Sequence, residues 1–140
     1  MASVIPKFVK KEIVDAWIGE SLYLMLLNNL YAPDAGHQYA GQSEILSRRL
    51  SANGAYPAEG VLLSGKVQGY DDNNAFLDAS NISIGPATTI NYRYGVVYAL
   101  KGASLSTSPI RCIIDFGSDQ IITNGTTVIE WNALGIIYVT

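Results

Sequence analysis

The chain of 140 residues is long enough for one domain with its own hydrophobic core, without metal or disulfide staples. Charged residues make up only 15% of it, against roughly 25% in a typical soluble domain, and the net charge is −3. Its nine Lys and Arg residues are scattered rather than interleaved with aromatic ones. This balance argues against a nucleic-acid-binding surface and predicts that other subunits cover part of the protein.

The chain offers little for catalysis. Its single cysteine, Cys112, excludes an intrachain disulfide and lies in an apolar, strand-like stretch, where a small buried side chain is expected rather than a nucleophile. The single histidine, His37, falls in a loop that contains Gly and Asp, so it is not expected to serve as a base for Cys112. We therefore expect no enzymatic activity, no cofactor and no metal.

No segment predicts contact with a membrane. The N-terminal residues lack the apolar core of a secretory signal. The longest unbroken aliphatic or aromatic run, Leu22–Leu27, is far shorter than the roughly 20 residues that a membrane-spanning helix needs.

The first predicted element is a short helix that begins at Pro6, runs to about Ile18 and is ended by Gly19. Helical spacing predicts one apolar face, made of Val9, Ile13, Ala16 and Trp17. We assign residues 1–19 to this N-terminal arm or helix and residues 20–140 to a β-domain. The β-domain begins with residues 21–28, a continuous apolar run that predicts a strand buried on both faces.

The middle of the chain is rich in turns. Residues 33–36 form a loop signal, and residues 44–50 fit either a helix or a strand. Residues 61–69 and 75–78 are predicted to pair as a hairpin around the four residues Asp71, Asp72, Asn73 and Asn74. These four residues carry oxygen ligands for a cation, but they lack the alternating spacing of a calcium loop, so a turn is favoured.

The second half predicts strands almost throughout. Residues 88–100, 109–116 and 126–139 are rich in Tyr, Ile, Val, Thr and Trp, which suit a pleated, half-buried surface. Gly85-Pro86 separates a short strand, 81–84, from the first of them, and Asn124-Gly125 predicts a tight hairpin turn between the last two. About eight strands in all predict a mainly β fold: a single antiparallel β-sandwich or flattened barrel with a short N-terminal helix or arm.

Several polar residues are expected in the strands. Arg93 is predicted on the face opposite Tyr92, Tyr94 and Tyr98, where it could join a polar seam with Asn91, Arg111, Asp115 and Glu130. Asp115-Phe116-Gly117 matches the metal-binding triplet of protein kinases, but the other kinase motifs are missing. We instead expect Asp115 at a strand end, paired with a cation or with turn amides. Trp131 alternates with Ile129 and is predicted in the core.

The seam is either a solvated face or a salt-bridged contact between subunits, since Arg and Tyr are favoured at interfaces. The candidate interface residues in the chain as a whole are Phe8, Ile13, Trp17, Arg93 and Arg111.

Stretches in order along nearly the whole chain resemble those of small virion structural proteins of tailed bacteriophages. No single motif is diagnostic, but the order is shared. The stretches are residues 8–28, the loop Tyr31-Ala32-Pro33-Asp34, Tyr39 with Glu44, residues 54–63 (where Glu59 replaces a Gly of the family pattern), Tyr94–Tyr98 (YGVVY), residues 106–117 (STSPIRCIIDFG), and Asn124-Gly125 with residues 129–135 (IEWNALG).

The resemblance implies a β-rich, non-enzymatic subunit of the phage particle. Our leading expectation is a capsid decoration or cement protein, which binds the major capsid protein and reinforces the head. A tail, neck or fibre-associated component is the alternative within the virion, and a carbohydrate-binding adhesin module is another, since exposed aromatic residues can stack on sugars. By analogy with decoration proteins, we expect a homo-oligomer, with a trimer favoured.

Overall fold

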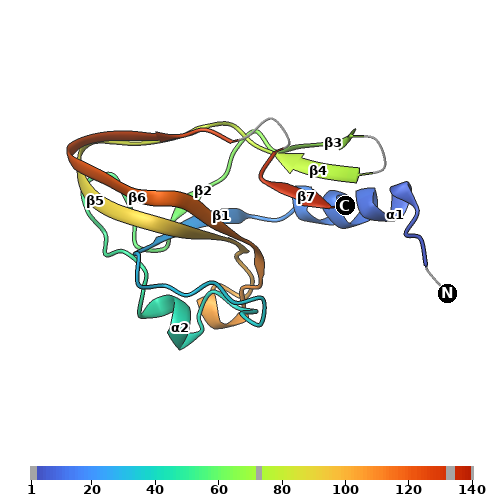
Figure 1. Cartoon of the computed structure of the whole chain (residues 1–140), viewed down its shortest axis with the longest axis horizontal. Coiled ribbons are helices and arrows are strands. Elements are labelled where there is room, and N and C mark those ends of the chain that lie inside the picture. Colours follow the sequence, from blue (N-terminus) through green and yellow to red (C-terminus); the bar gives the residue numbers. More distant parts are fainter. Residues whose placement is uncertain (1–2, 72–73, 132–134, 140) are drawn as a thin grey trace.

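The computed structural model describes residues 3–71, 74–131 and 135–139. They form two antiparallel sheets, a large one with strand order β2-β1-β5-β6 and a small one with order β3-β4-β7. The prediction of a mainly β, sandwich-like fold with a short N-terminal helix is confirmed (Figure 1). The elements are α1 (Lys7–Ile18), β1 (Leu22–Leu27), α2 (Ser43–Leu46), β2 (Val61–Leu62), β3 (Val67–Asp71), β4 (Asn74–Asp78), β5 (Ile82–Ala99), the short 3₁₀ helix η1 (Leu105–Thr107), β6 (Ile110–Ile129) and β7 (Ile137–Val139).

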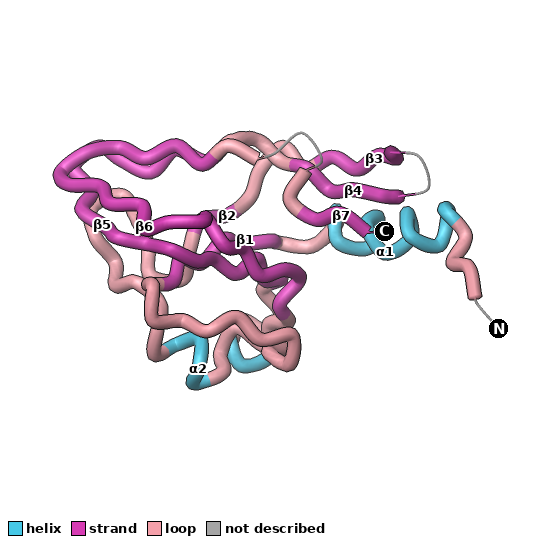
Figure 2. The backbone as a smooth tube through the Cα atoms, viewed as in Figure 1, coloured by secondary structure: helices cyan, strands magenta, loops and turns pink. Residues whose placement is uncertain are grey.

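Two unusually long strands dominate the molecule. β5 has 18 residues and β6 has 20, and they pair along their length as a ribbon that bends back on itself (Figure 2). The bend places the early half of β5 and the late half of β6 over the part of the ribbon that pairs with β1 (Figure 1). The ribbon thus supplies strands to both layers of the sandwich.

Irregular pairing accompanies the bend in the ribbon. The register between β5 and β6 shifts between Ile84 and Thr88, where the Gly85-Pro86 bond is cis and Ala87 has a φ of 57°. It shifts again between Thr88 and Ile90 and between Tyr92 and Tyr94. Extra residues in one strand of a pair increase its local twist and bend it, so these bulges let one ribbon turn through the fold.

The predicted hairpin turn at Asn124-Gly125 is wrong. Both residues lie inside β6, and Gly125 pairs with Thr88 of β5. Asn124 does have a positive φ, 45°. Its amide donates a hydrogen bond to the Thr89 hydroxyl at 3.0 Å, in place of a backbone hydrogen bond between the two strands, as happens at a bulge. Likewise, Gly85-Pro86 interrupts the pairing of β5 without ending the strand. Both signals mark bulges, because pairing with the partner strand continues on either side.

The large sheet is buried on both of its faces. β1 shows this most clearly: Leu22, Leu24 and Leu26 point into one core cluster, while Met25 and Leu27 point into a second. All five are fully buried, which confirms the prediction for this strand. The folded-back ribbon contributes Ile82, Ile84, Ile90 and Ile129 to the first cluster. Tyr31, Ala40 and Ile45, from the loops and α2, cover the second.

The bulges change which side chains share a face. Tyr92 lies in the first cluster, whereas Tyr94 and Tyr98 belong to the second, and the pairing with β6 is irregular between Tyr92 and Tyr94. The expectation that all three tyrosines share one face is therefore wrong. A similar shift separates Ile110, on the second cluster, from Cys112, on the first.

The hairpin predicted around residues 71–74 is present, since β3 pairs with β4 from Val67↔Asp78 to Asp71↔Asn74. Its turn, and with it the possible cation site, lies outside the described residues. The single strand predicted over residues 61–69 is instead divided between β2 and β3, which belong to different sheets. Gly65, with a φ of 63°, lies between them in a backbone conformation that interrupts a strand.

The helix α1 packs against the small sheet. Its buried side contains Val14, which is fully buried, and Lys10, while Trp17 packs at the margin of the first core cluster. Of the predicted apolar face, Val9 and Trp17 are partly buried, whereas Ile13 and Ala16 are exposed. The helix carries apolar residues around much of its circumference, so the contact with the sheet decides which side is buried. The 1–19 and 20–140 division stays a prediction, although Val14 ties α1 to the core of the β-strands.

Trp131 follows the end of β6 and is partly buried against the first cluster, with its indole N–H donating to the Ser80 carbonyl at 3.1 Å. The expected core position therefore holds only in part. The ambiguous stretch 44–50 forms the single turn α2 followed by an isolated bridge between Arg49 and Leu27.

Candidate functional site

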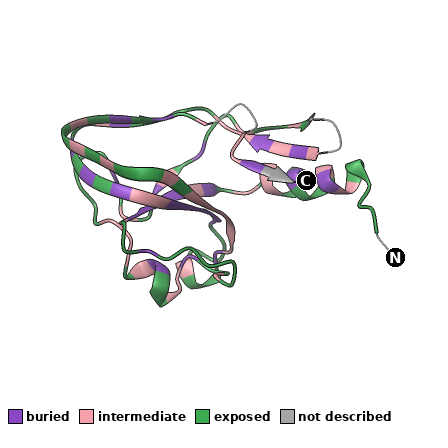
Figure 3. Cartoon of the chain, viewed as in Figure 1, coloured by how far each residue is buried: buried purple, intermediate pink, exposed green. Residues whose placement is uncertain are grey.

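Exposed apolar side chains gather at the start of α1. Val4 is 88% exposed, Ile5 56% and Phe8 61%, and this end of the chain projects beyond the body of the protein (Figure 3). We call residues Ser3–Pro6 the N-terminal segment. It is joined to α1 at Pro6, whose φ of −57° and ψ of 145° keep the backbone extended.

The solvent side of α1 carries two of the candidate interface residues. Successive helical residues are rotated by about 100°, so Phe8 and Ile13 flank a strip that also contains Glu12 and Ala16. All four are exposed. We call Phe8 and Ile13, with the strip between them, the α1 surface. Tyr70 of β3 lies next to another side of the helix, since the Lys7 ammonium lies 4.5 Å from the centre of the Tyr70 ring.

Trp17 and Arg111 lie together, and both are partly buried. The guanidinium of Arg111 lies 5.6 Å from the centre of the Trp17 ring. The same guanidinium makes two hydrogen bonds to the Glu20 carboxylate, from Nε to Oε1 at 3.0 Å and from Nη2 to Oε2 at 2.6 Å. Lys101 adds an ion pair to Oε2 at 2.8 Å. Arg111 is therefore engaged in a contact that ties the start of β6 to the residues after α1.

Glu20 is the centre of this cluster and was not singled out from the sequence. Burial of its carboxylate opposes ionisation, but the hydrogen bonds from Arg111 and Lys101 outweigh that effect and hold the pKa of Glu20 below its ordinary value. Its backbone carbonyl also accepts a hydrogen bond from Lys66, just before β3. The only sequence signal was an acidic residue directly after the glycine that ends the helix.

Arg93 forms a separate ion pair with Asp115. Its Nε donates to Oδ1 at 2.8 Å, and the Gly117 amide donates to the same oxygen at 2.7 Å. The hydrogen bond from Arg93, followed by that from Gly117, lowers the pKa of Asp115. The expected pairing of Asp115 with a cation is confirmed, but the amide that it accepts from belongs to Gly117 of β6 rather than to a turn, and Asp115 itself lies within β6 rather than at a strand end. The predicted seam is divided, since Arg111 belongs to the Glu20 cluster.

The Cys112 thiol is poorly suited to act as a nucleophile. Burial raises the pKa of the Cys112 thiol to about 12, so the thiol stays protonated at neutral pH. In the described parts of the chain, no group of three or more His, Cys, Asp or Glu residues is arranged to hold a metal ion. Nor does any helix among these residues have the length and apolar character needed to cross a membrane.

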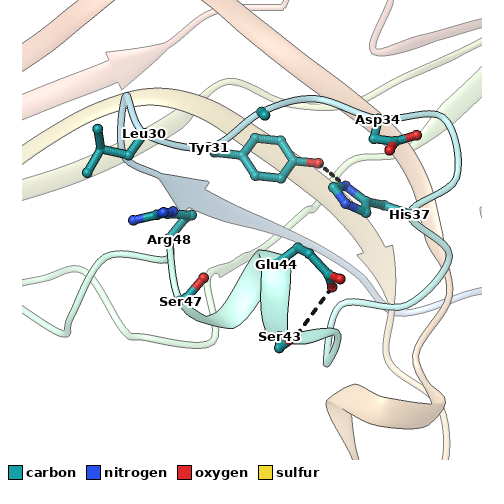
Figure 4. A pocket seen from close by; sticks show the side chains of 9 residues that line it. Leu30, Tyr31, Asp34, His37, Ser43, Glu44, Ser47 and Arg48 are labelled. Atoms are coloured by element: carbon teal, nitrogen blue, oxygen red, sulfur yellow. Dashed lines mark hydrogen bonds between the residues drawn. The ribbon is translucent and has the colours of Figure 1, made fainter.

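An open cavity of about 530 Å³ lies between the loop after β1 and α2 (Figure 4). Its polar lining includes Asp34, His37, Glu44 and Arg48. The Tyr31 hydroxyl lies 2.7 Å from Nδ1 of His37, but the Tyr31 ring is buried and packs edge-on against Tyr94. The cavity therefore offers hydrogen-bonding groups without presenting the Tyr31 ring as a stacking surface.

In comparisons with known proteins, no protein-family model, no curated protein and no solved structure matches the chain.

Proposed function

We propose that this chain is a non-enzymatic structural subunit of a tailed-bacteriophage virion, and specifically a capsid decoration or cement protein. It would bind the major capsid protein on the assembled head, as one copy of a homo-oligomer. The observation that carries the proposal is the ordered resemblance of motifs along nearly the whole chain, from residues 8–28 to residues 129–135.

The α1 surface supports this proposal by its exposure. Phe8 is 61% exposed and Ile13 39% exposed, so both leave apolar area in water on the solvent side of α1. Apolar area exposed on one side of a helix and rimmed by polar residues is a common sign of a protein contact. The opposite side of α1 is fixed by the burial of Val14. A partner could therefore bind the α1 surface without unfolding the domain, so we assign attachment to the capsid to this surface.

The internal ion pairs narrow the choice of interface residues. Arg111 is held by Glu20 and Arg93 by Asp115, so neither guanidinium needs a partner protein to neutralise it. Trp17 lies partly buried next to Arg111. Of the five candidate residues, Phe8 and Ile13 are thus the two that the proposal assigns to the capsid contact.

Two alternative functions lead to different expectations. A tail, neck or fibre-associated subunit would use the same surface at another place on the particle. An adhesin module would need an exposed aromatic platform, but the Tyr31 ring in the polar cavity is buried and the Tyr70 ring faces the Lys7 ammonium. Neither of these two rings is a free platform, whereas Tyr39, which is 41% exposed, is the tyrosine that an adhesin would present.

The copy number of the chain in purified particles tests the proposal. Quantitative mass spectrometry would give the ratio of this chain to the major capsid protein in particles from the phage that encodes it. We expect hundreds of copies per particle, as the resemblance implies for decoration proteins. A few to dozens of copies would assign the chain to the tail or neck. Its absence from purified particles would refute a virion function.

A further inference from the structure

An apolar cavity of about 410 Å³ lies near the start of β1 and the end of β5. One wall is formed by Tyr23 and Tyr98, whose rings stack with centroids 5.5 Å apart at 14°. Pro57, Leu100 and Leu105 complete most of the apolar lining. We call this site the tyrosine pocket. Its volume lies in the lower part of the range of ligand sites, roughly 300–1,000 Å³, which suits a few aliphatic side chains.

The N-terminal segment carries exposed aliphatic side chains that could fill this apolar pocket. Val4 and Ile5 are among the most exposed apolar residues of the chain, and neither is covered by the body of the protein. Pro6 is extended, and a residue that precedes proline, here Ile5, is itself restricted to extended backbone. An apolar strand that is already extended loses less conformational entropy when it binds than a flexible one does.

The tyrosine pocket and the N-terminal segment also have charges of opposite sign beside them. Among the described residues that line the tyrosine pocket, Glu59 alone is charged, and it is exposed at the pocket. Lys7 is the first charged residue after the N-terminal segment. Its present contact is with the ring of Tyr70 at an exposed site, where a cation–π interaction contributes little. With Val4 and Ile5 in the pocket, Lys7 could approach Glu59.

The segment cannot reach the pocket of its own chain while α1 stays docked. It leaves the N-terminal end of α1, whereas Tyr23 follows the C-terminal end of the helix (Figure 1). The 12 residues of α1 span about 18 Å, and the three residues Val4–Pro6 reach at most about 10 Å when extended. Undocking α1 would expose Val14, which is fully buried. If the segment fills the pocket, it therefore does so on another copy of the chain.

We propose that Val4, Ile5 and Pro6 of one copy bind in the tyrosine pocket of a second copy, with Lys7 paired to Glu59 of that copy. The two surfaces differ, so the contact is head-to-tail. Such a contact closes into a ring or continues as an open chain, and each copy both gives a segment and accepts one. The proposal concerns self-association in solution and stands independently of the virion function.

The test measures the oligomeric state of the full chain by sedimentation over a series of concentrations. The double variant V4D/I5D removes the segment's apolar contacts, and L100D puts a charge in the pocket. A103E, which blocks the pocket from a surface position, covers the possibility that L100D fails to fold. I121D is the matched control, since Ile121 is 67% exposed on β6, away from both surfaces. We expect the wild type and I121D to associate, and the segment and pocket variants to associate at least about 100-fold more weakly.

Mixing the variants distinguishes this contact from any other. V4D/I5D keeps an intact pocket and A103E keeps an intact segment, so a mixture can form only one head-to-tail contact per pair. We expect a 1:1 heterodimer from two variants that are each monomeric alone. A monomeric wild type would overturn the proposal. So would wild-type association of V4D/I5D, or a mixture that remains monomeric.

Discussion

The two ends of the molecule differ in how their apolar side chains are used. Around the large sheet, apolar residues of β1 and of the folded ribbon are buried on both faces, with Leu22, Leu24 and Leu26 fully covered. At the other end, Val14 of α1 packs with Ala75, Leu77 and Ile137 of the small sheet in the same core cluster as β1, while Phe8 and the N-terminal segment remain in water. The comparison indicates that both sheets share one core with α1, and that the difference lies at the surface, where the start of α1 leaves apolar side chains in water.

The largest effect should come from the large sheet. Leu24 is fully buried at the centre of β1, so Leu24→Ala should reduce the free energy of unfolding by about 2–5 kcal/mol. Leu62 lies on β2 in the same sheet but is 52% exposed. Leu62→Ala should therefore change the free energy of unfolding by about 0.5 kcal/mol or less. Urea denaturation of both variants checks the contrast. Equal losses of stability in the two variants would contradict the expectation that the buried Leu24 contributes more than the exposed Leu62.

Two glycines test the description of the ribbon and its surroundings. Gly60 has a φ of 96°, and a Cβ there would overlap the Leu24 carbonyl, so Gly60→Ala should cost about 1–3 kcal/mol. Gly125 is outside the left-handed region, and its nearest neighbours would lie 3.5 and 3.6 Å from a Cβ. Gly125→Ala should therefore shift stability by about 0.5 kcal/mol or less. A large loss at Gly125 would favour the hairpin turn over the bulge.

The Glu20 cluster joins the two ends and should make stability depend on pH. Because the pKa of Glu20 is lower in the folded protein than its ordinary value of 4.5, its ionised form stabilises the fold above that pH. This stabilisation is lost as the pH falls from about 4.5 through the folded pKa. Glu20→Gln should cost about 1–3 kcal/mol at neutral pH, since Arg111 loses a charged acceptor.

Denaturation of wild type and Glu20→Gln across this pH range measures the effect. The stability gap between them should narrow as the pH is lowered. A gap that is constant with pH would show that Glu20 contributes through packing rather than through its charge.

The smallest effect on stability should come from the α1 surface. Phe8→Asp and Ile13→Asp alter side chains that are 61% and 39% exposed, so the melting temperature should hardly move. Thermal unfolding, with Val128→Asp on the exposed side of β6 as the control, checks this expectation. A marked loss of stability at Phe8 would mean that this residue supports the fold rather than a contact.

Local patterns predicted the elements that depend on local chemistry. The continuous run of Leu22–Leu27 indicated a doubly buried strand, and Asp71–Asn74 indicated the hairpin between β3 and β4. Asn124-Gly125 was misinterpreted because tight turns and bulges both favour residues that tolerate a positive φ. What decides between them is the pairing of residues beyond Asn124 with the first half of β5, far away in the sequence.

Side-chain partners were harder to predict than strands. Arg93 and Asp115 were predicted to share a polar seam, and they do form an ion pair, between β5 and β6. Arg111 was assigned to the same seam, but it lies beside a register shift between β5 and β6. It pairs instead with Glu20, which follows α1 and is 91 positions away in the sequence. Such contacts depend on how distant elements pack, and no local spacing in the chain encodes them.

Binding of the purified chain to phage particles that lack it is the most direct test of the central claim. The wild type should saturate the heads of such particles, as measured by co-sedimentation and located by electron microscopy. The double variant F8D/I13D should remain folded but bind at least about tenfold more weakly, whereas V128D should bind like the wild type. Wild-type binding by F8D/I13D would show that the α1 surface is not the capsid contact. Failure of the wild type to bind heads would contradict the decoration function itself.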